Sequence, residues 1–396
     1  MRIAIITEVF LPKVDGIVTR LTGTLTQLRE LGHEALVFAP GKAPAEYAGH
    51  RVVRVPSVSF GRVYPDLRVG FPGPRHAREL HAFRPDVVHV VNPVWTGSFG
   101  ALYAERRKHP MLGSFHTDVP AYARRLGLGA LARPAEAWIR RSHNRASVNL
   151  CTSQQMIEKA RGFGIENLDL WPKAVDTERF TAANASREMR ARLTDGHPDA
   201  PLILSVGRLS KEKDLDLLRH ALDRAPQGTR LAFVGDGPAA ADLRALFRGT
   251  PTVFTGPLRG RDLDEAYASA DVFAFPSTTE TLGLVALEAM ASGTPVVGAD
   301  AGGIPFAVPD GVGGLLARPR DAADLSEKLN RVLTDAGLRS RLAEGARAAT
   351  EPFGWRASTE ALVGFYERAI AAENAKTTPP RAEKGRSRTP GSAPRT

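Results

Sequence analysis

Short apolar runs alternate with longer amphipathic stretches along most of the chain. In the first half, the runs predict strands at Ile3–Thr7, Ala35–Ala39, Val52–Val55, Val87–Val91, Met111–Phe115 and Val148–Cys151. A second series predicts strands at Leu202–Val206, Leu231–Val234, Val253–Thr255, Val272–Ala274 and Pro295–Gly298. Stretches with helical spacing separate several of these runs, such as Val18–Leu31, which reaches Gly32 as a C-cap. Alternation of this kind is typical of parallel sheets covered on both faces.

Two such series in 396 residues predict the fold class α/β, with two doubly wound Rossmann-like domains facing a cleft. The expected units are an N-terminal domain at 1–178, a C-terminal domain at 179–350, a helix at 351–373 returning to the first domain, and a basic tail at 374–396. The tail is rich in Pro, Ser, Thr and Gly, so we expect it to be disordered.

The composition is that of a soluble globular protein, with 43% hydrophobic and 24% charged residues. No apolar run reaches the ~18 residues of a transmembrane helix. The N-terminal run MRIAIITEVF meets Glu8 early, which favours a first strand over a signal peptide. The only cysteine, Cys151, excludes an internal disulfide and fits a reducing compartment. We therefore expect a cytoplasmic protein.

The net charge of +10 is unevenly distributed. The tail contributes part of it, and the segment 121–146 carries Arg124, Arg125, Arg133, Arg140, Arg141 and Arg145 among Tyr122, Leu126, Leu128, Leu131, Trp138 and Ile139. This mixture suits a helix on an anionic membrane surface. The alternative is that its apolar face packs inside the domain. No nucleic-acid-binding module accompanies the charge, so we expect no nucleic acid partner.

Three glycine-containing loops follow predicted strands, where ligands of parallel sheets bind. They contain Gly16, the pair Arg208 and Lys213, and Gly235. A glycine lets the backbone approach a phosphate, and the two cations suit an anion, although ordinary turns and solvated cations would look the same. The loop at Gly235 matches G-x-G-x-x-A, but no acidic residue follows about 20 positions later, which disfavours a dehydrogenase.

The strongest motif is FPSTTETLGLVALEAMASGTP, residues 275–295. It predicts a strand, a turn containing Glu280, and a helix that begins near Leu284 and stops at Gly293. Glu288 lies on this apolar helix and needs a partner, for which sugar or ribose hydroxyls would serve. The alternative is a carboxylate on one exposed stripe. His116 closes a first-half strand, where it is either structural or part of a site.

Two D-x-D sequences, Asp214–Asp216 and Asp262–Asp264, raise the question of a metal-held substrate. Both are interpreted as helix starts, where aspartate is favoured by capping and by the helix dipole. We therefore expect neither a metal site nor a cofactor.

Together these residues resemble a retaining GT-B glycosyltransferase of family four, over Arg2 to about Ala372. The resemblance rests on Gly16, on G-R-x4-K at 207–213, on E-x7-E at 280–288 and on F-x-W at 353–355. TEVFLPKVDGIVTRL and SFHTDVPAYARRLGL look most like actinobacterial GDP-mannose-dependent α-mannosyltransferases, which act on lipid acceptors. They also resemble enzymes that move sulfoquinovose onto diacylglycerol.

The resemblance implies a role for each site residue. Arg208 and Lys213 hold the donor diphosphate, Glu288 holds the ribose, and the catalytic residues are Glu280 at the sugar hydroxyls and His116 against the sugar. The other expected donor-binding residues are Gly16, Gly235, Thr281, Leu282, Gly283, Leu284 and Val285. The first domain then serves the acceptor and the second binds the nucleotide sugar.

The expected activity is retaining, metal-independent transfer of a hexose, α-mannose from GDP-mannose, onto a lipid-linked or glycolipid acceptor. This implies a nucleotide-sugar donor, no separate cofactor, and attachment to the inner face of the plasma membrane. A UDP-sugar-dependent glycosyl or sulfoquinovosyl transferase is the main alternative. A sugar-nucleotide epimerase shares the architecture but would need acid/base carboxylates in the cleft and no acceptor.

Overall fold

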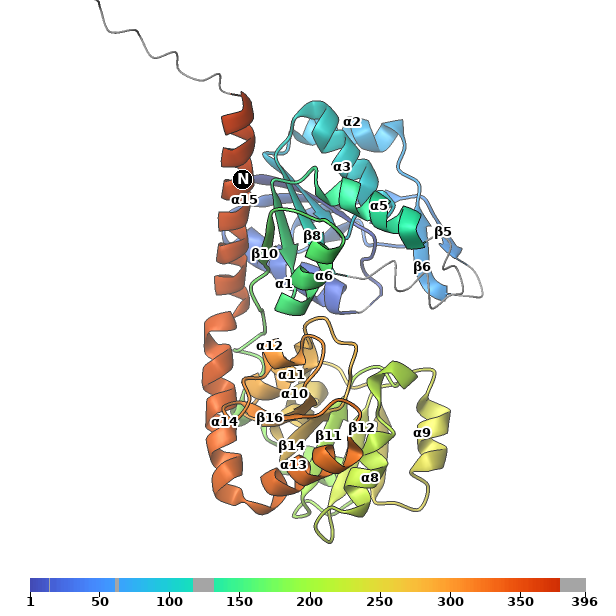
Figure 1. The fold of residues 1–396 in the computed structure, drawn as a ribbon, viewed down its shortest axis with the longest axis vertical. Coiled ribbons are helices and arrows are strands. Elements are labelled where there is room, and N and C mark those ends of the chain that lie inside the picture. Colours follow the sequence, from blue (N-terminus) through green and yellow to red (C-terminus); the bar gives the residue numbers. More distant parts are fainter. Residues whose placement is uncertain (14, 61–63, 117–131, 378–396) are drawn as a thin grey trace, which may run out of the picture.

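A computed structural model describes residues 1–13, 15–60, 64–116 and 132–377. It contains two α/β domains, one above the other in Figure 1, so the predicted fold class is confirmed. The N-terminal sheet has eight strands and the C-terminal sheet has six. All paired neighbours within these two sheets are parallel except β3 and β4.

The N-terminal domain is built from the following described elements. Its sheet strands are β1 (Arg2–Thr7), β2 (Glu34–Pro40), β3 (Glu46–Tyr47), β4 (His50–Val55), β7 (Val87–Val91), β8 (Met111–Phe115), β9 (Val148–Cys151) and β10 (Leu168–Leu170). A separate hairpin consists of β5 (Ser57–Phe60) and β6 (Tyr64–Gly70). Its helices are α1 (Gly16–Glu30), α2 (Pro74–Phe83), α3 (Thr96–Arg107), α5 (Ala132–His143) and α6 (Gln154–Gly162).

The C-terminal domain follows the same plan. Its strands are β11 (Leu202–Val206), β12 (Arg230–Val234), β13 (Thr252–Gly256), β14 (Val272–Phe275), β15 (Val296–Ala299) and β16 (Gly314–Ala317). Its helices are α7 (Arg187–Leu193), α8 (Leu217–Asp223), α9 (Ala240–Leu246), α10 (Arg261–Ala268), α11 (Leu284–Ala291), α12 (Ile304–Ala307), α13 (Ala322–Thr334) and α14 (Ala336–Thr350). Short 3-10 turns lie at Ala182–Asn184, Lys211–Lys213 and Glu351–Phe353.

Each sheet reverses its strand order at one point. The first sheet has the order β10-β9-β8-β7-β1-β2-β4-β3, so the chain leaves β1 toward β2 and later returns beside it with β7. The second has the order β13-β12-β11-β14-β15-β16, with the reversal between β11 and β14. Ligands of open α/β sheets bind beyond the strand carboxyl ends at such reversals. The fold therefore marks the loops after β1 and β7 in the first sheet and after β11 and β14 in the second, and the end of β8 lies one strand away from the first reversal.

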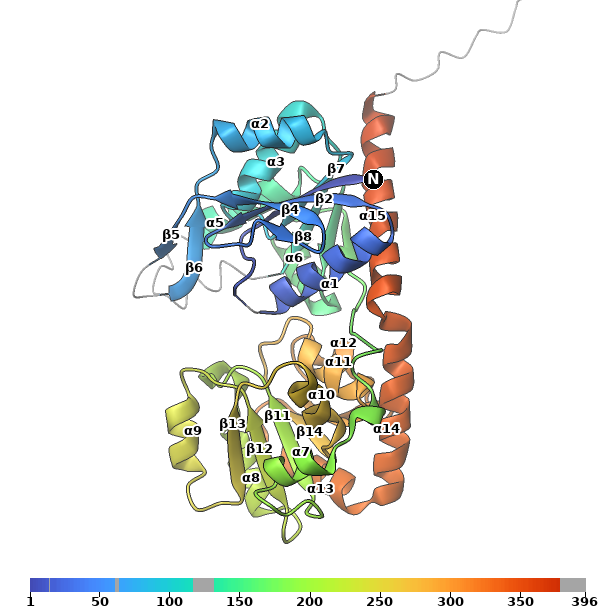
Figure 2. The same ribbon diagram turned by 180° about the vertical axis from the view of Figure 1, so that it is seen from behind.

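The last helix, α15 (Trp355–Thr377), extends from the C-terminal domain along the N-terminal one, as Figures 1 and 2 show from opposite sides. Leu362 and Tyr366 are fully buried in the same cluster as Leu21 and Leu25 of α1. The helix continues past the predicted end at residue 373 to Thr377, and in this last turn Lys376 Nζ donates to Ser147 Oγ of the first domain at 3.4 Å. Residues 378–396, most of the predicted tail, lie outside the described part.

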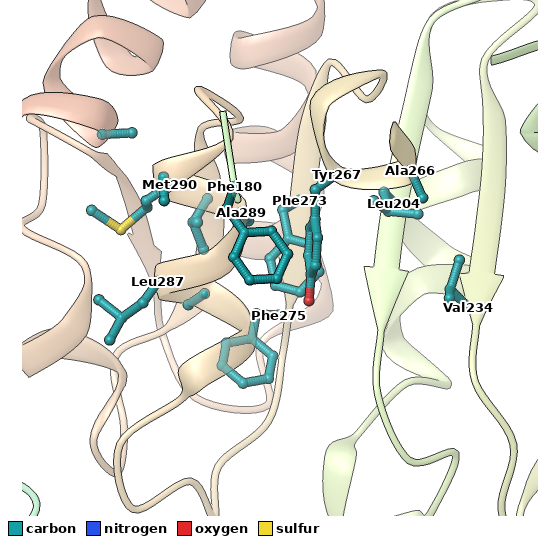
Figure 3. Packing of buried hydrophobic residues seen from close by; sticks show 14 of the residues in the cluster. Phe180, Leu204, Val234, Ala266, Tyr267, Phe273, Phe275, Leu287, Ala289 and Met290 are labelled. Carbon is teal, nitrogen blue, oxygen red and sulfur yellow. The ribbon is translucent and has the colours of Figure 1, made fainter. Parts of the chain in front are cut away.

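The C-terminal core explains why α11 is apolar almost all round. Ala286, Leu287, Ala289 and Met290 are completely buried. Figure 3 shows Leu287, Ala289 and Met290 near aromatic rings from β14 and α10. Since the helix is enclosed by protein, its single carboxylate, Glu288, lies at the one side that faces the cleft.

Two details differ from the sequence interpretation. Lys213 ends a 3-10 turn, and the left-handed backbone of Asp214 (φ +50°) separates this turn from α8, which begins at Leu217. Asp216 is the N-cap residue of α8, so the predicted helix start is confirmed there and not at Asp214. The Asp214 carboxylate accepts a hydrogen bond from Thr278 Oγ1 at 2.9 Å, so it links two loops and is not a helix cap. Asp262 and Asp264 do lie in the first turn of α10, as predicted.

None of the helices in the described ranges is both long enough and apolar enough to cross a bilayer.

Candidate active site

A cleft of about 1170 Å³ lies between the domains, at the carboxyl ends of both sheets. Except for Gly235, all of the predicted site residues line it: Gly16, His116, Arg208, Lys213, Glu280, Thr281, Leu282, Gly283, Leu284, Val285 and Glu288. The first domain also contributes residues that were not singled out from the sequence, among them Arg20, Thr152 and Trp171. The structure thus brings the separate motifs to one place.

The two walls of the cleft approach each other at the start of α1. Asp15 caps this helix by accepting a hydrogen bond from the Val18 N–H at 3.0 Å. A Cβ added at Gly16 would lie 3.7 Å from Leu284 Cδ1, at the start of α11 in the other domain. Thr152 Oγ1 also donates to the Thr281 carbonyl oxygen at 3.3 Å. The N-termini of α1 and α11 therefore lie close together, and the first N–H groups of a helix have no partner within the helix, so this is a place where an anion would be stabilised.

Gly235 lies behind the cleft wall and not on it. A Cβ at this position would be 1.9 Å from the Gly207 carbonyl oxygen, so the glycine allows two loops to pack together. Its neighbour Gly237 lines the cleft in its place. The sequence match found the correct loop, but G-x-G spacing alone does not distinguish the glycine that packs from the one that faces a ligand.

Arg208 and Lys213 reach the cleft from the loop after β11. The Gly207 N–H donates to the Val234 carbonyl at 2.9 Å, and the Leu209 N–H donates to the Asp236 carbonyl at 3.0 Å, so the backbone is held on both sides of Arg208. The Arg208 side chain is exposed, and no hydrogen bond or ion pair ties it to a described residue. Because the backbone of Arg208 is held while its guanidinium can change position, the side chain can adjust to the position of a ligand phosphate.

Glu280 and Lys213 form an ion pair across the C-terminal side of the cleft, through Lys213 Nζ and Glu280 Oε1. The Gly303 N–H donates to the Glu280 carbonyl at 2.7 Å, and a Cβ at Gly302 would come within 2.5 Å of that oxygen. The loop after β15 therefore supports the backbone of Glu280. A ligand carrying both a phosphate and hydroxyl groups can engage the lysine and the carboxylate together.

Glu288 has a protein partner that the sequence did not indicate. Its Oε2 accepts a hydrogen bond of 2.8 Å from the hydroxyl of Tyr267, which is fully buried in the cluster of Figure 3. Arg179 stands nearby and donates to both carboxylate oxygens of Asp264, at 2.8 and 3.0 Å. Burial raises the pKa of Glu288 from 4.5 to about 7, with Tyr267 and Arg179 offsetting part of the rise.

The raised pKa predicts a pH-dependent stability. Because Glu288 ionises less readily in the folded chain than in the unfolded chain, its favourable contribution is complete below pH 4.5 and is lost as the pH rises through about 7. The free energy of unfolding of the wild type should therefore fall relative to that of Glu288→Gln between pH 4.5 and 8. Urea unfolding of both proteins measures this difference. Equal differences at the two ends of the range would contradict it.

His116 is buried at the end of β8, and its Nε2 lies 3.0 Å from Ser114 Oγ. The same hydroxyl is 3.1 Å from His89 Nε2, and His89 Nδ1 is 2.8 Å from the Tyr366 hydroxyl on α15. Burial, and then the charge of Arg20, lowers the pKa of His116 to about 3. His116 is therefore a neutral imidazole at neutral pH, held in orientation by a chain of hydrogen bonds that reaches α15.

The acidic pairs have other partners in the structure. Asp262 forms an ion pair with Arg192 at 3.0 Å, and Asp264 pairs with Arg179 at 2.7 Å. Among the described residues, no group of three or more His, Cys, Asp or Glu side chains is arranged to hold a metal ion.

Comparison with known proteins establishes the family. The profile described as Glycosyltransferase Family 4 matches residues 14–179, and the profile described as Glycosyl transferases group 1 matches residues 200–335. A sulfoquinovosyl transferase of Arabidopsis thaliana is 41% identical over 87% of this chain and 69% of its own length. A GDP-mannose-dependent alpha-mannosyltransferase of Mycobacterium tuberculosis is 38% identical over 93% of this chain and 96% of its own.

Among solved structures, HepE of Anabaena in complex with UDP superposes with a TM-score of 0.75, at 20% identity, over 93% of this chain and 100% of that one. The two-domain architecture with its central cleft is therefore the GT-B fold. The chain belongs to glycosyltransferase family 4, and the predicted family is confirmed.

Proposed function

We propose that this glycosyltransferase moves a hexose, with retention of configuration and without a metal ion, from a nucleotide sugar onto a lipid or glycolipid acceptor. The observation that carries the proposal is the meeting of two kinds of groups in one interdomain cleft. Arg208, Lys213 and two helix N-termini suit a diphosphate, while Glu280 and Glu288 suit the hydroxyls of a sugar and a ribose.

The chemistry needs stabilisation of charge on the leaving group. As the bond between the sugar C1 and the diphosphate oxygen breaks, negative charge grows on that oxygen, opposite Arg208, Lys213 and the amide of Gly16. The acceptor oxygen forms its bond to C1 on the same face, and its proton passes to the departing phosphate oxygen. Glu280 orients the sugar in this scheme, and the neutral His116 lies against it from the other domain.

GDP-mannose is the donor we propose, in line with the mannosyltransferase relatives of 33–38% identity. UDP-sulfoquinovose is the second candidate, favoured by the Arabidopsis relative at 41%. Calorimetric titration with GDP, UDP and ADP, each with and without attached hexose, should give tightest binding for the GDP series. Tighter binding of the UDP series would select the second candidate. Turnover of a nucleotide sugar without acceptor, to its epimer, would indicate an epimerase instead.

Transfer should persist in excess EDTA, because the protein supplies two cations and two helix N-termini for the diphosphate. The measurement is the transfer rate to a lipid acceptor with and without chelator. A rate abolished by EDTA and restored by magnesium would contradict this prediction. The aspartates at 214, 216, 262 and 264 would then be candidate metal ligands.

We also propose that the N-terminal domain docks on an anionic membrane. Phe71, Trp95 and Trp138 are each about half exposed, at 50–52%. The rings of Phe71 and Trp95 meet edge to face at 6.4 Å, and Trp138 Nε1 donates to the Val94 carbonyl at 2.9 Å, so all three lie near the start of α3. Exposed aromatic rings beside arginines suit a lipid interface.

The described part of the predicted membrane segment supports this surface only in part. On α5, Arg140 and Arg141 are exposed, whereas Ile139 is only 3% exposed and packs inside the domain. Arg133 is also exposed on α5, whereas Arg145 pairs with Glu105 at 2.8 Å. The other residues of that prediction, Tyr122, Arg124, Arg125, Leu126, Leu128 and Leu131, lie outside the described residues.

Wild type should therefore sediment with anionic liposomes, less at high salt, and little with neutral ones. Each arginine near the surface adds ~1 kcal/mol, so replacing Arg124, Arg125, Arg140 and Arg141 with Ser should abolish sedimentation. Truncation after Ala375 is the control and should leave it unchanged. If truncation alone releases the protein, the tail and not this surface binds the membrane.

A further inference from the structure

Arg20 is a buried cation that no carboxylate in the described part of the chain neutralises. It lies on α1, one turn after Gly16, and its exposed fraction is 5%. Its Nη2 donates to the Pro172 carbonyl and, at 3.0 Å, to Ser358 Oγ. Its Nε is buried without a hydrogen-bond partner among the described residues. Protein groups thus use only part of the guanidinium.

The surroundings of Arg20 do not compensate its charge. Trp171 and Trp355 lie 4.9 and 5.8 Å from the guanidinium carbon, and their faces provide weak cation–π stabilisation. Burial lowers the pKa of Arg20 to about 9. If Arg20 only held α1 against Pro172 and Ser358, a neutral polar side chain would be enough. Burying an unpaired charge costs free energy of folding.

The position of Arg20 links this charge to the cleft. Arg20 lines the cleft together with Gly16, His116 and Trp171. The nearby carboxylate of Asp15 is occupied, since it caps α1 and pairs with Lys13 at 3.0 Å. The other cleft carboxylates with stated roles, Glu280 and Glu288, belong to the opposite domain. An anionic group entering on the N-terminal side would therefore meet a guanidinium with donors to spare.

We propose that Arg20 forms a subsite for a sulfonate or phosphate group carried by one of the two substrates, on the N-terminal wall of the cleft beside His116. The group is distinct from the donor diphosphate, which the proposed function assigns to Arg208 and Lys213. Its source is either a charged substituent on the transferred hexose or the phosphate of a lipid acceptor. This inference rests on the proposed function, because it takes the cleft as the site of both substrates.

Two matched ligand pairs separate the sources. UDP-sulfoquinovose and UDP-glucose differ by a sulfonate on the hexose, and dihexanoyl phosphatidate and dihexanoylglycerol differ by a phosphate on the lipid. Calorimetry on the full chain should show that the wild type prefers the charged member of one pair. Arg20→Met should reduce affinity for that member by about 10- to 100-fold, the loss of charge-assisted hydrogen bonds, and leave its neutral counterpart unchanged.

Two further variants separate binding from folding. Ser358→Ala removes a hydrogen bond of Arg20 but keeps its charge, so it should retain the preference. Arg20→Lys keeps the charge without the fork and should retain part of it. The inference is overturned if the wild type shows no preference in either pair, or if Arg20→Met weakens both members equally. It is also overturned if Arg20→Met lowers the affinity for unsubstituted UDP by the same factor as for the charged ligand. The same holds if Ser358→Ala abolishes the preference for the charged ligand as completely as Arg20→Met does.

Failure of the proposed function would look different. A protein without hexosyltransferase activity toward any lipid would refute that function, while the charge preference and its dependence on Arg20 would still be measured by binding. A protein that transfers hexose normally, but whose Arg20→Met variant shows no charge-specific loss, would refute only the subsite.

Discussion

Arg208→Ala and Lys213→Ala should each slow hexose transfer about 100-fold. Both side chains line the cleft from a loop whose backbone is held by the neighbouring strand loop, so the substitution removes a charge without removing a support. The lost stabilisation acts on charge that develops as the diphosphate leaves, and one such donor is typically worth about 3 kcal/mol. Steady-state kinetics with a saturating acceptor measures the effect.

Lys211→Ala is the matched control for this pair. Lys211 lies in the same 3-10 turn as Lys213, but it is exposed and does not line the cleft. Its replacement should leave the transfer rate within about twofold, because a solvent-screened charge contributes little. Rates near that of the wild type in both Arg208→Ala and Lys213→Ala would remove the diphosphate assignment. Arg208→Ala is the cleaner variant, since loss of Lys213 also leaves Glu280 without its ion-pair partner.

The sequence predicted most of the parallel strands because they are buried apolar runs, and it also predicted β13, which is only partly buried. It missed the β5–β6 hairpin and the short strands β3, β10 and β16. In β10, Leu168 and Leu170 are separated by Asp169, and all three are only partly buried, so the hydrophobic signal is weak. The helix start expected at Asp214–Asp216 lies at Asp216 and not at Asp214, because Asp214 has a left-handed backbone, which no hydrophobic pattern encodes.

Except for Glu288, which lies inside α11, the cleft residues found from sequence share one property: each lies in a loop or at a helix start next to a strand, where spacing along the chain reflects position in space. Tyr267 and Trp171 reach the site from elements that are distant in sequence, and only tertiary packing brings them there. The sequence does contain an indication that Arg20 is unusual. It lies on the same helix face as the buried Thr24 and next to Leu21, so a charge stands where the helical pattern requires a core residue.

The two carboxylates of the E-x7-E motif should fail in different ways when each is changed to glutamine. Glu280 precedes α11 and pairs with Lys213, whereas Glu288 lies within the helix and accepts from Tyr267. Glu280→Gln should reduce the turnover number on the order of 100-fold, because the group that orients the sugar loses its charge. Its affinity for free nucleotide should stay within about threefold of wild type.

Glu288→Gln should instead lower the affinity for free nucleotide about tenfold. A neutral amide accepts a hydrogen bond from a ribose hydroxyl less strongly than a carboxylate does. Tyr267→Phe should also lower the affinity for nucleotide, but by less, because Glu288 stays in place and loses only the hydrogen bond that holds its Oε2. Glu344→Gln is the control: it makes the same Glu-to-Gln change at an exposed position on α14, away from the cleft, and should leave the affinity for nucleotide unchanged. Calorimetry with the nucleotide, compared with turnover under saturating donor, separates the two roles. If the Glu288→Gln protein binds nucleotide as tightly as wild type, the ribose assignment is wrong, and Tyr267 then supports only the fold of α10 against α11.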